Sequence, residues 1–205
     1  MQSIKEMDNN VSKRKAHEVI LNVPNILTII RLVLIPFLIY FLLQTGTRSM
    51  WIAFGIFAAA SMTDYIDGEV ARRWGLITDF GKIWDPIADK ALTLGAFATL
   101  SYMGLLPWWF TVIVAAREFY ITWLRKRLLA RGVVVSANFS GKAKTMLQMM
   151  LIAFLIVPWG SFVDITGVIY PIVYWTMVIA TLALTLYSGW SYLKPILDKG
   201  VPKVS

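Results

Sequence analysis

Apolar residues occur in long runs that short polar or basic stretches separate. The first run follows Asn22 and ends near Leu43, which is about the 20 residues that a helix needs to cross a bilayer. Similar runs follow, with approximate bounds of 50–71, 83–103, 107–128, 142–157 and 167–192. The pattern predicts an all-α integral membrane protein with six transmembrane helices.

The two ends of the chain are more polar than these runs. Residues 1–22 are basic and lack the apolar core of a signal peptide, which predicts a retained cytoplasmic extension. Within it, residues 11–23 are predicted either to lie on the membrane as a short interfacial helix or to belong to a disordered tail. Residues 23–193 form the predicted membrane domain, and residues 194–205 form a cytoplasmic tail.

The basic residues predict how the spans are oriented. Of the 20 Lys and Arg residues, we assign only Arg48 to the outer side, in the turn between the first two spans. The others lie in the termini, in the stretches 72–82 and 125–144, or in adjoining span ends, so both termini are predicted to be cytoplasmic. The net charge of +8 then follows from topology and from attraction to anionic lipids and phosphates, without nucleic-acid binding.

Composition limits the kinds of site that the chain can build. With 58% hydrophobic and 16% charged residues, it is too apolar for an ordinary soluble domain. It has no cysteine, and its single histidine, His17, lies in a charged segment, which excludes disulfides, thiolate zinc sites and histidine-based metal sites. A metal site would therefore use oxygen ligands, which select a hard divalent cation.

The main candidate site lies between residues 64 and 89. Helical spacing puts two carboxylates and two small residues on one face, namely Asp64, Asp67, Gly68 and Ala71. The same spacing groups Gly81, Asp85 and Asp89. If residues 73–81 turn the chain back, four carboxylates converge, and their mutual repulsion requires cations nearby. We therefore predict a metal site; the alternative is helix caps or solvated charges, as we expect for Asp79 in the connecting loop.

This stretch resembles the signature of the CDP-alcohol phosphotransferase family at every motif position. It reads D-x-x-D-G-x-x-A-R, then eight residues, then G-x-x-x-D-x-x-x-D. The resemblance implies that the four aspartates bind two Mg²⁺ or Mn²⁺ ions, which hold the pyrophosphate of CDP-diacylglycerol, and that Asp89 is the general base. It also implies that Gly68 and Ala71 make room for the donor and that Arg72 contacts its phosphates. The alternatives are close helix packing for the small residues and membrane anchoring for Arg72.

A polar stripe opens the first span. Asn25, Thr28 and Arg31 follow one another at intervals of three residues near the predicted cytoplasmic end. The family resemblance implies contact with the nucleotide part of CDP-diacylglycerol. A capping role for Asn25, and an Arg31 side chain that extends toward the lipid head groups, are the alternatives.

Basic residues form a second candidate site. Arg117 and Arg125 are eight residues apart, hence on nearly the same helix face, and Lys142 and Lys144 open the next span. Arg117 lies inside an apolar run and needs a partner, which Glu118 or an anionic ligand can supply. The segments A-R-E-F, L-R and G-K-x-K-T-x-x-Q resemble the phosphatidylglycerophosphate synthase branch of the family. That resemblance implies that these four basic residues bind sn-glycerol 3-phosphate, whereas we expect Lys126, Arg127 and Arg131 to be ordinary interfacial charges.

The resemblance thus implies an enzyme of the bacterial cytoplasmic membrane, with its active site at the cytoplasmic face. It would transfer the phosphatidyl group from CDP-diacylglycerol to sn-glycerol 3-phosphate, and it would contact membrane lipid and form a homodimer. A related transferase with inositol phosphate or phosphatidylglycerol as acceptor is one alternative. A cation channel or transporter is another, but the predicted carboxylates cluster at one face instead of crossing the bilayer.

Overall fold

The computed structural model describes residues 23–44, 46–74, 79–130, 139–161 and 167–199. Within the helices, the description excludes the side chains at positions 23, 24, 64–74, 79–83, 139 and 195–199. The predicted interfacial helix and the end of the predicted cytoplasmic tail lie outside the described residues.

The described chain is all-helical, as the sequence predicted. Its α-helices are α2 (Val23–Leu43), α3 (Thr47–Trp74), α4 (Asp79–Tyr102), α5 (Trp108–Ala130), α6 (Phe139–Ile156) and α7 (Ile169–Lys199). A short 3₁₀ helix, Trp159–Ser161, precedes α7. Each of the six helices corresponds to one predicted apolar run.

Two of the described helices are long and apolar enough to cross a membrane, in the segments Asn25–Leu43 and Ile169–Lys194. The helices α4, α5 and α6 carry charged residues within their length, among them Asp89, Arg117 and Lys144, and these charges lower their hydropathy. Crossing of the membrane by all six helices therefore stays a prediction.

The connection between α3 and α4 is shorter than the sequence analysis predicted. We expected residues 73–81 to turn the chain back, but α3 continues to Trp74 and α4 begins at Asp79. The loop placement of Asp79 was therefore wrong, because this residue starts α4. Pro86 lies inside α4, where it cannot donate a backbone hydrogen bond.

A glycine ends α4. Gly104 has a φ of 76°, the left-handed conformation that a residue without a Cβ adopts most easily. Its N–H donates to the carbonyl oxygen of Ser101 at 3.1 Å, and the N–H of Leu105 donates to that of Leu100 at 2.9 Å. This pair of bonds is a Schellman motif, which satisfies the last carbonyls of α4 and directs the chain into α5.

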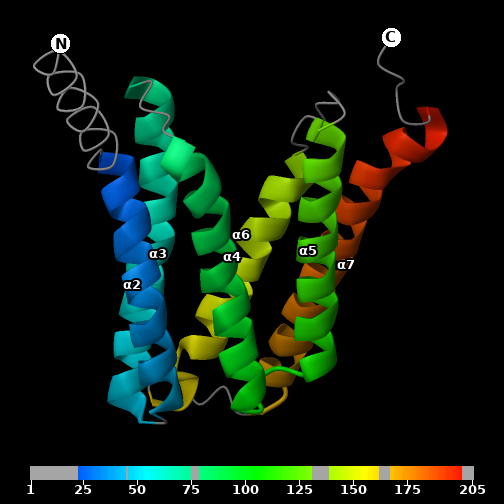
Figure 1. Cartoon of the computed structure of the whole chain (residues 1–205). Helices are drawn as coiled ribbons and strands as arrows, with labels where there is room; N and C mark the ends of the chain where they lie inside the picture. Colours follow the sequence, from blue (N-terminus) through cyan, green and yellow to red (C-terminus); the bar gives the residue numbers. More distant parts are fainter. Residues whose placement is uncertain (1–22, 45, 75–78, 131–138, 162–166, 200–205) are drawn as a thin grey trace, which may run out of the picture.

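The helices pack as two connected groups. Helix α2 lies against α3 and α4, whereas α6 lies against α7, and α4 contacts both α5 and α6. In Figure 1 the starts of α2, α4 and α6 and the ends of α3, α5 and α7 lie at one end of the bundle, drawn at the top. We call this the upper end.

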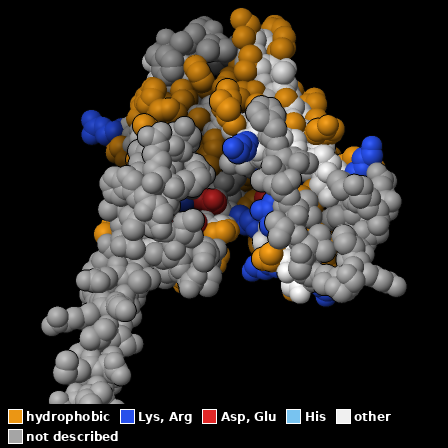
Figure 2. Space-filling model, turned by 90° about the horizontal axis from the view of Figure 1, so that it is seen from above, with side chains coloured by type: hydrophobic (Ala, Val, Ile, Leu, Met, Phe, Trp, Pro, Cys, Tyr) orange, Lys and Arg blue, Asp and Glu red, His pale blue; other side chains and the backbone are white. Residues whose placement is uncertain are grey.

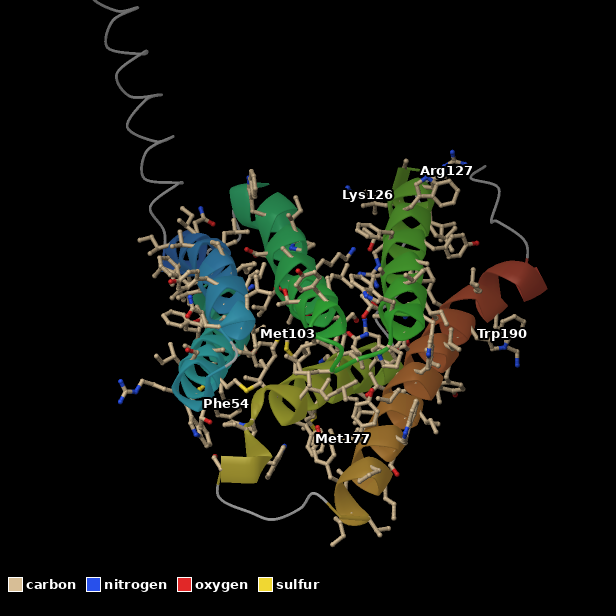
Figure 3. The ribbon with its side chains drawn as sticks, turned by 90° about the horizontal axis from the view of Figure 1, so that it is seen from below. Phe54, Met103, Lys126, Arg127, Met177 and Trp190 are labelled. Atoms are coloured by element: carbon tan, nitrogen blue, oxygen red, sulfur yellow. The ribbon has the colours of Figure 1, made fainter. Side chains whose placement is uncertain are left out.

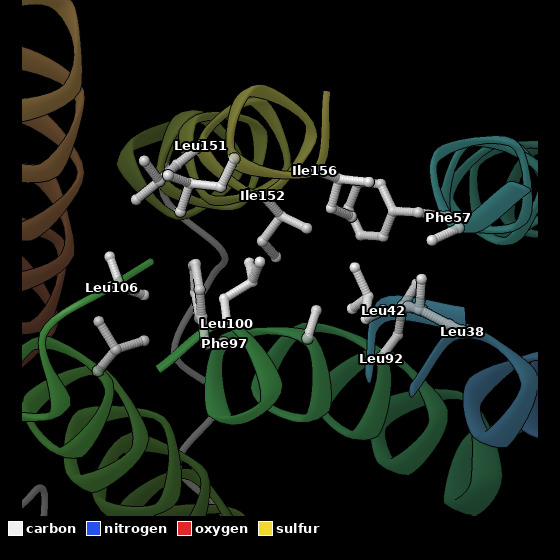
Figure 4. Close-up of a cluster of buried hydrophobic side chains, with 14 of the residues drawn as sticks. Leu38, Leu42, Phe57, Leu92, Phe97, Leu100, Leu106, Leu151, Ile152 and Ile156 are labelled. Carbon is white, nitrogen blue, oxygen red and sulfur yellow. The ribbon is translucent and has the colours of Figure 1, made fainter. Parts of the chain in front are cut away.

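Buried apolar side chains join the two groups below the upper end. Figure 4 shows side chains of α2, α3, α4 and α6 meeting in one cluster, together with Leu106 from the turn before α5. Phe97 of α4 and Phe110 of α5, both fully buried, add an edge-to-face contact with ring centroids 5.4 Å apart. Burial of this apolar surface holds the helices in fixed positions and thereby fixes the polar residues above it.

We expect Arg48 and Lys126 to lie on opposite sides of the membrane. Both side chains are exposed. Arg48 lies at the start of α3, at the end of the bundle opposite the upper end (Figure 1), and Lys126 lies near the end of α5 (Figure 3). Because the chain contains no cysteine, the variants Arg48→Cys and Lys126→Cys each carry one thiol. In right-side-out membrane vesicles, a membrane-impermeant maleimide should label Arg48→Cys, and should label Lys126→Cys only after permeabilisation. The reverse pattern would contradict the predicted topology.

Candidate functional site

Two polar contacts join the beginning of α2 to the beginning of α4. Thr28 Oγ1 donates a hydrogen bond to Asp85 Oδ1 at 2.5 Å, and Arg31 Nη1 lies 2.6 Å from Asp89 Oδ1 in an ion pair. Thr28 and Arg31 are about one turn apart on α2, as are Asp85 and Asp89 on α4. The matched spacing lets both pairs form together.

The two partners of the Arg31–Asp89 ion pair differ in solvent exposure. The side chain of Arg31 is 0% exposed, whereas that of Asp89 is 45% exposed. A buried guanidinium is costly unless it is paired, and Asp89 supplies that pairing. The alternative in which Arg31 reaches the lipid head groups is therefore wrong.

Asn25 is fully buried inside α2, which begins at Val23, so it does not cap the helix. The predicted donor contacts of the three residues stay predictions.

The carboxylates of Asp85 and Asp89 fit a hard divalent cation. Both lie on the face of α4 that meets α2, and carboxylate oxygens are the preferred ligands of such ions. Asp64 and Asp67 belong to α3, which also packs on α2, but their side chains lie outside the described residues. The same applies to Gly68, Ala71, Arg72 and Gly81. Within the described part, no three acidic or histidine side chains form a metal-binding group, so convergence of the four aspartates stays a prediction.

A basic cluster lies where α5, α6 and α7 meet. Arg117 Nη1 lies 2.9 Å from Glu118 Oε1, and Lys144 Nζ forms an ion pair with the same oxygen. Arg117 Nη2 donates a hydrogen bond to Ser188 Oγ at 2.8 Å. We call Arg117, Glu118, Lys144 and Ser188 the basic pocket. The charged side chains in it are at most 14% exposed, and two cations share one carboxylate.

This arrangement supplies the partner that Arg117 needs. The sequence left Glu118 and an anionic ligand as alternatives, and Glu118 fills the role in the structure. Among the described residues, Arg117 Nε is buried without a hydrogen-bond partner, and a Cβ at position 189 would lie 3.4 Å from it. Arg117 thus packs closely against the backbone of α7 at Gly189.

The other predicted acceptor residues lie at the surface of the same end. Arg125 is exposed, and its guanidinium carbon lies 5.6 Å from the ring centroid of Tyr192. Its position against α7, like that of Arg117, agrees with the predicted common face. Lys142 is also exposed, whereas Lys144 is buried. Arg127 is exposed, and its guanidinium carbon lies 4.1 Å from the ring centroid of Trp123. Such a cation–π contact is compatible with an ordinary interfacial charge.

The acidic and basic groups belong to different parts of the bundle. Asp85 and Asp89 lie where α4 meets α2, and the basic pocket lies among α5, α6 and α7. Viewed from the upper end, Figure 2 shows a hollow that contains both acidic and basic side chains. A ligand in such a hollow can contact carboxylate-bound cations on one side and basic side chains on the other.

Sequence reasoning missed several residues of this region. Ser188 and Gly189 belong to α7, which carried no motif, although a small polar pair inside an apolar run was a signal for close packing. Lys90 was also missed. It follows Asp89 directly, is half-buried, and donates a hydrogen bond to Thr122 on α5. A lysine inside a predicted span was a signal for function.

Replacement of Asp89 should destabilise the protein more than replacement of Asp85. Asp89→Asn removes the charge from a pair with a fully buried guanidinium, a class of bond worth about 1.5–3 kcal/mol. Asp85→Asn weakens a bond from a neutral hydroxyl and takes no counter-ion from a buried charge, so the loss is smaller. Thermal unfolding of the detergent-solubilised variants should therefore give the lower midpoint for Asp89→Asn. An equal or lower midpoint for Asp85→Asn would show that the Arg31 pair is not the stronger contact.

Comparison with known proteins identifies relatives over most of this chain. A family model described as CDP-alcohol phosphatidyltransferase matches residues 21–187. The match includes both groups of charged residues and ends one residue before Ser188.

Individual relatives have related names. A protein of Mycobacterium tuberculosis named "Probable phosphatidylglycerophosphate synthase" is 37% identical over 177 residues, which are 85% of this chain and 81% of the relative. A Bacillus subtilis protein named "CDP-diacylglycerol--glycerol-3-phosphate 3-phosphatidyltransferase" is 36% identical, over 83% of this chain and 93% of its own. An Escherichia coli protein of the same name is 34% identical, over 84% and 93%.

Proposed function

The chain belongs to the CDP-alcohol phosphatidyltransferase family, and we propose that it transfers the phosphatidyl group of CDP-diacylglycerol to sn-glycerol 3-phosphate. The products would be phosphatidylglycerol phosphate and CMP. The observation that carries the proposal is the hollow at the upper end, where a buried basic pocket and two carboxylates belong to opposite groups of helices. The names of the relatives support this choice of acceptor.

The aspartate side would bind the donor. We propose that Asp64, Asp67, Asp85 and Asp89 hold two Mg²⁺ or Mn²⁺ ions. When bound, such ions neutralise the pyrophosphate and stabilise the negative charge that develops on its oxygens during transfer. Thr28 and Arg31 would orient Asp85 and Asp89, since each pair is linked by a side-chain contact. Asn25, Gly68, Ala71 and Arg72 remain the proposed contacts of the rest of the donor.

Asp89 would also serve as the general base. Its side chain is 45% exposed, so a hydroxyl in the hollow can approach it. In the proposed reaction the acceptor hydroxyl loses its proton to Asp89, its oxygen bonds to the phosphorus that carries diacylglycerol, and CMP leaves. Most of the rate acceleration would come from the positioning of two anionic substrates and from charge stabilisation.

The basic pocket would bind the phosphate of the acceptor. Arg117 and Lys144 are almost fully buried and share one counter-ion, so an added anion gains attraction in a site with little water. Arg125 and Lys142 would add attraction from the exposed rim. An acceptor phosphate loses its hydration on entry, and charge-assisted hydrogen bonds offset that loss.

The exposed apolar surface and the family support the proposed location. Many large apolar side chains are exposed on the bundle, among them Phe119, Trp123 and Trp190, and such a surface fits lipid or a partner chain. We propose that the protein lies in the bacterial cytoplasmic membrane with the upper end at the cytoplasmic face. A homodimer remains part of the proposal.

Purified protein in detergent micelles should release CMP from CDP-diacylglycerol when sn-glycerol 3-phosphate is present. Release should require Mg²⁺ or Mn²⁺ and should stop in excess chelator, because four converging carboxylates need compensating cations. Parallel reactions with inositol phosphate and phosphatidylglycerol test the other acceptors. Turnover with one of these alone would replace the proposed acceptor, and full turnover in chelator would refute the metal site.

Arg117→Ala should raise the KM for sn-glycerol 3-phosphate about ten-fold or more, because a charged hydrogen bond is worth about 1.5–3 kcal/mol. The KM for CDP-diacylglycerol should change far less. Lys144→Ala should act similarly, and the exposed Arg125 and Lys142 should give smaller effects. Arg127→Ala, which removes an exposed charge outside the pocket, is the matched control. A selective loss on the donor side would assign the pocket to the nucleotide instead.

A further inference from the structure

Lys90 links the two groups of charged residues. It follows Asp89 in α4, but its ammonium group is directed to α5, where it donates a hydrogen bond to Thr122 Oγ1. Thr122 Oγ1 in turn donates to the backbone oxygen of Glu118 at 2.7 Å. Lys90 is thus linked through Thr122 to Glu118 of the basic pocket, while its neighbour Asp89 contacts α2.

The ammonium group of Lys90 has a neutral partner. Within the described part of the chain, its hydrogen bond goes to the Thr122 hydroxyl, and no carboxylate forms an ion pair with it. It is half-buried and close enough to Glu118 and Lys144 to interact with both electrostatically. A partly buried lysine near other cations is repelled by them, and a bound anion would offset this repulsion.

The charges near Lys90 match a phosphate monoester. Lys90, Arg117 and Lys144 are three cations around the single carboxylate of Glu118, and Arg125 and Lys126 also lie close enough to repel Lys90, so positive charge is in excess. A phosphate monoester carries about −1.5 to −2 at neutral pH. An entering phosphate would therefore reduce this excess of positive charge.

We propose that Lys90 is a further acceptor-binding residue, which contacts the phosphate of the acceptor together with Arg117 and Lys144. The proposal rests on the proposed function and deepens it. Lys90 fits the acceptor better than the donor because its ammonium group lies against α5, whereas Asp85 and Asp89 face α2. In this position Lys90 would hold the phosphate while the hydroxyl of the same acceptor lies at Asp89.

The test compares three variants of the full chain in detergent micelles. Lys90→Met keeps a long side chain and removes the charge. Thr122→Val removes the hydroxyl that holds Lys90 but keeps all charges. Arg127→Met removes an exposed charge at the end of α5, where the guanidinium lies over Trp123, and is the control. For each, the dissociation constant of sn-glycerol 3-phosphate is measured by calorimetry without donor, and both KM values are measured by CMP release.

Lys90→Met should raise the dissociation constant and the KM for sn-glycerol 3-phosphate about ten-fold, with little change in the donor KM. Thr122→Val should change them by about three-fold or less, and Arg127→Met should leave them unchanged. Lys90→Arg should restore most of the binding, since it restores the charge. Glycerol, which lacks the phosphate, should bind all variants equally weakly.

Three results would overturn the proposal. Equal losses in Lys90→Met and Thr122→Val would mean that the contact only joins α4 to α5. A loss confined to the donor KM would place Lys90 on the pyrophosphate. If the unmodified protein did not bind sn-glycerol 3-phosphate, the proposed phosphate-binding site would be wrong. Binding is measured apart from turnover, so a protein that binds this ligand but transfers to another acceptor would refute the proposed function and still test Lys90.

Discussion

The need to pair every charge that the helices bury determines how the upper end is built. A charged side chain inside an apolar bundle is costly, and a pair is retained only with close geometry. Arg31 meets this condition through Asp89, and Arg117 and Lys144 meet it through Glu118. Each set of contacts joins different helices, so the same charges that would serve chemistry also fix how α2 meets α4 and how α5 meets α6.

The apolar cluster and the charged end have separate roles in this design. Below the upper end, side chains such as Phe97, Phe110 and Leu151 are fully buried and fill the space between the helices. Toward the upper end, charged residues replace them, and a hollow remains. A rigid packed region beneath an open polar region favours positioning, because the residues proposed to bind two anions would then be held before either anion arrives.

Much of the architecture could be predicted from the sequence, because apolar runs of bilayer length coincide with the helices. The boundaries were less accurate, since α3 and α4 extend past the apolar residues and shorten the connection that was expected to include Asp79. The identity of the charged residues was also readable from spacing. Their partners were not, because the Thr28–Asp85 contact depends on how α2 packs against α4, and Ser188 lies in a helix without a motif. The side chains of Asp64 and Asp67 lie outside the described residues, so their convergence with Asp85 and Asp89 rests on the sequence.

The position of Lys90 beside Asp89 would let one helix contact two groups of the same acceptor. Successive residues on an α-helix point about 100° apart, so adjacent side chains reach different neighbours. On α4, Asp89 is paired with α2 and Lys90 is bonded to α5. If the carboxylate acts on the acceptor hydroxyl and the ammonium group binds its phosphate, the distance between these two functions is set by the backbone of a single helical turn. Such a distance does not depend on loop conformation, and it would select acceptors whose hydroxyl and phosphate are separated by a short carbon chain.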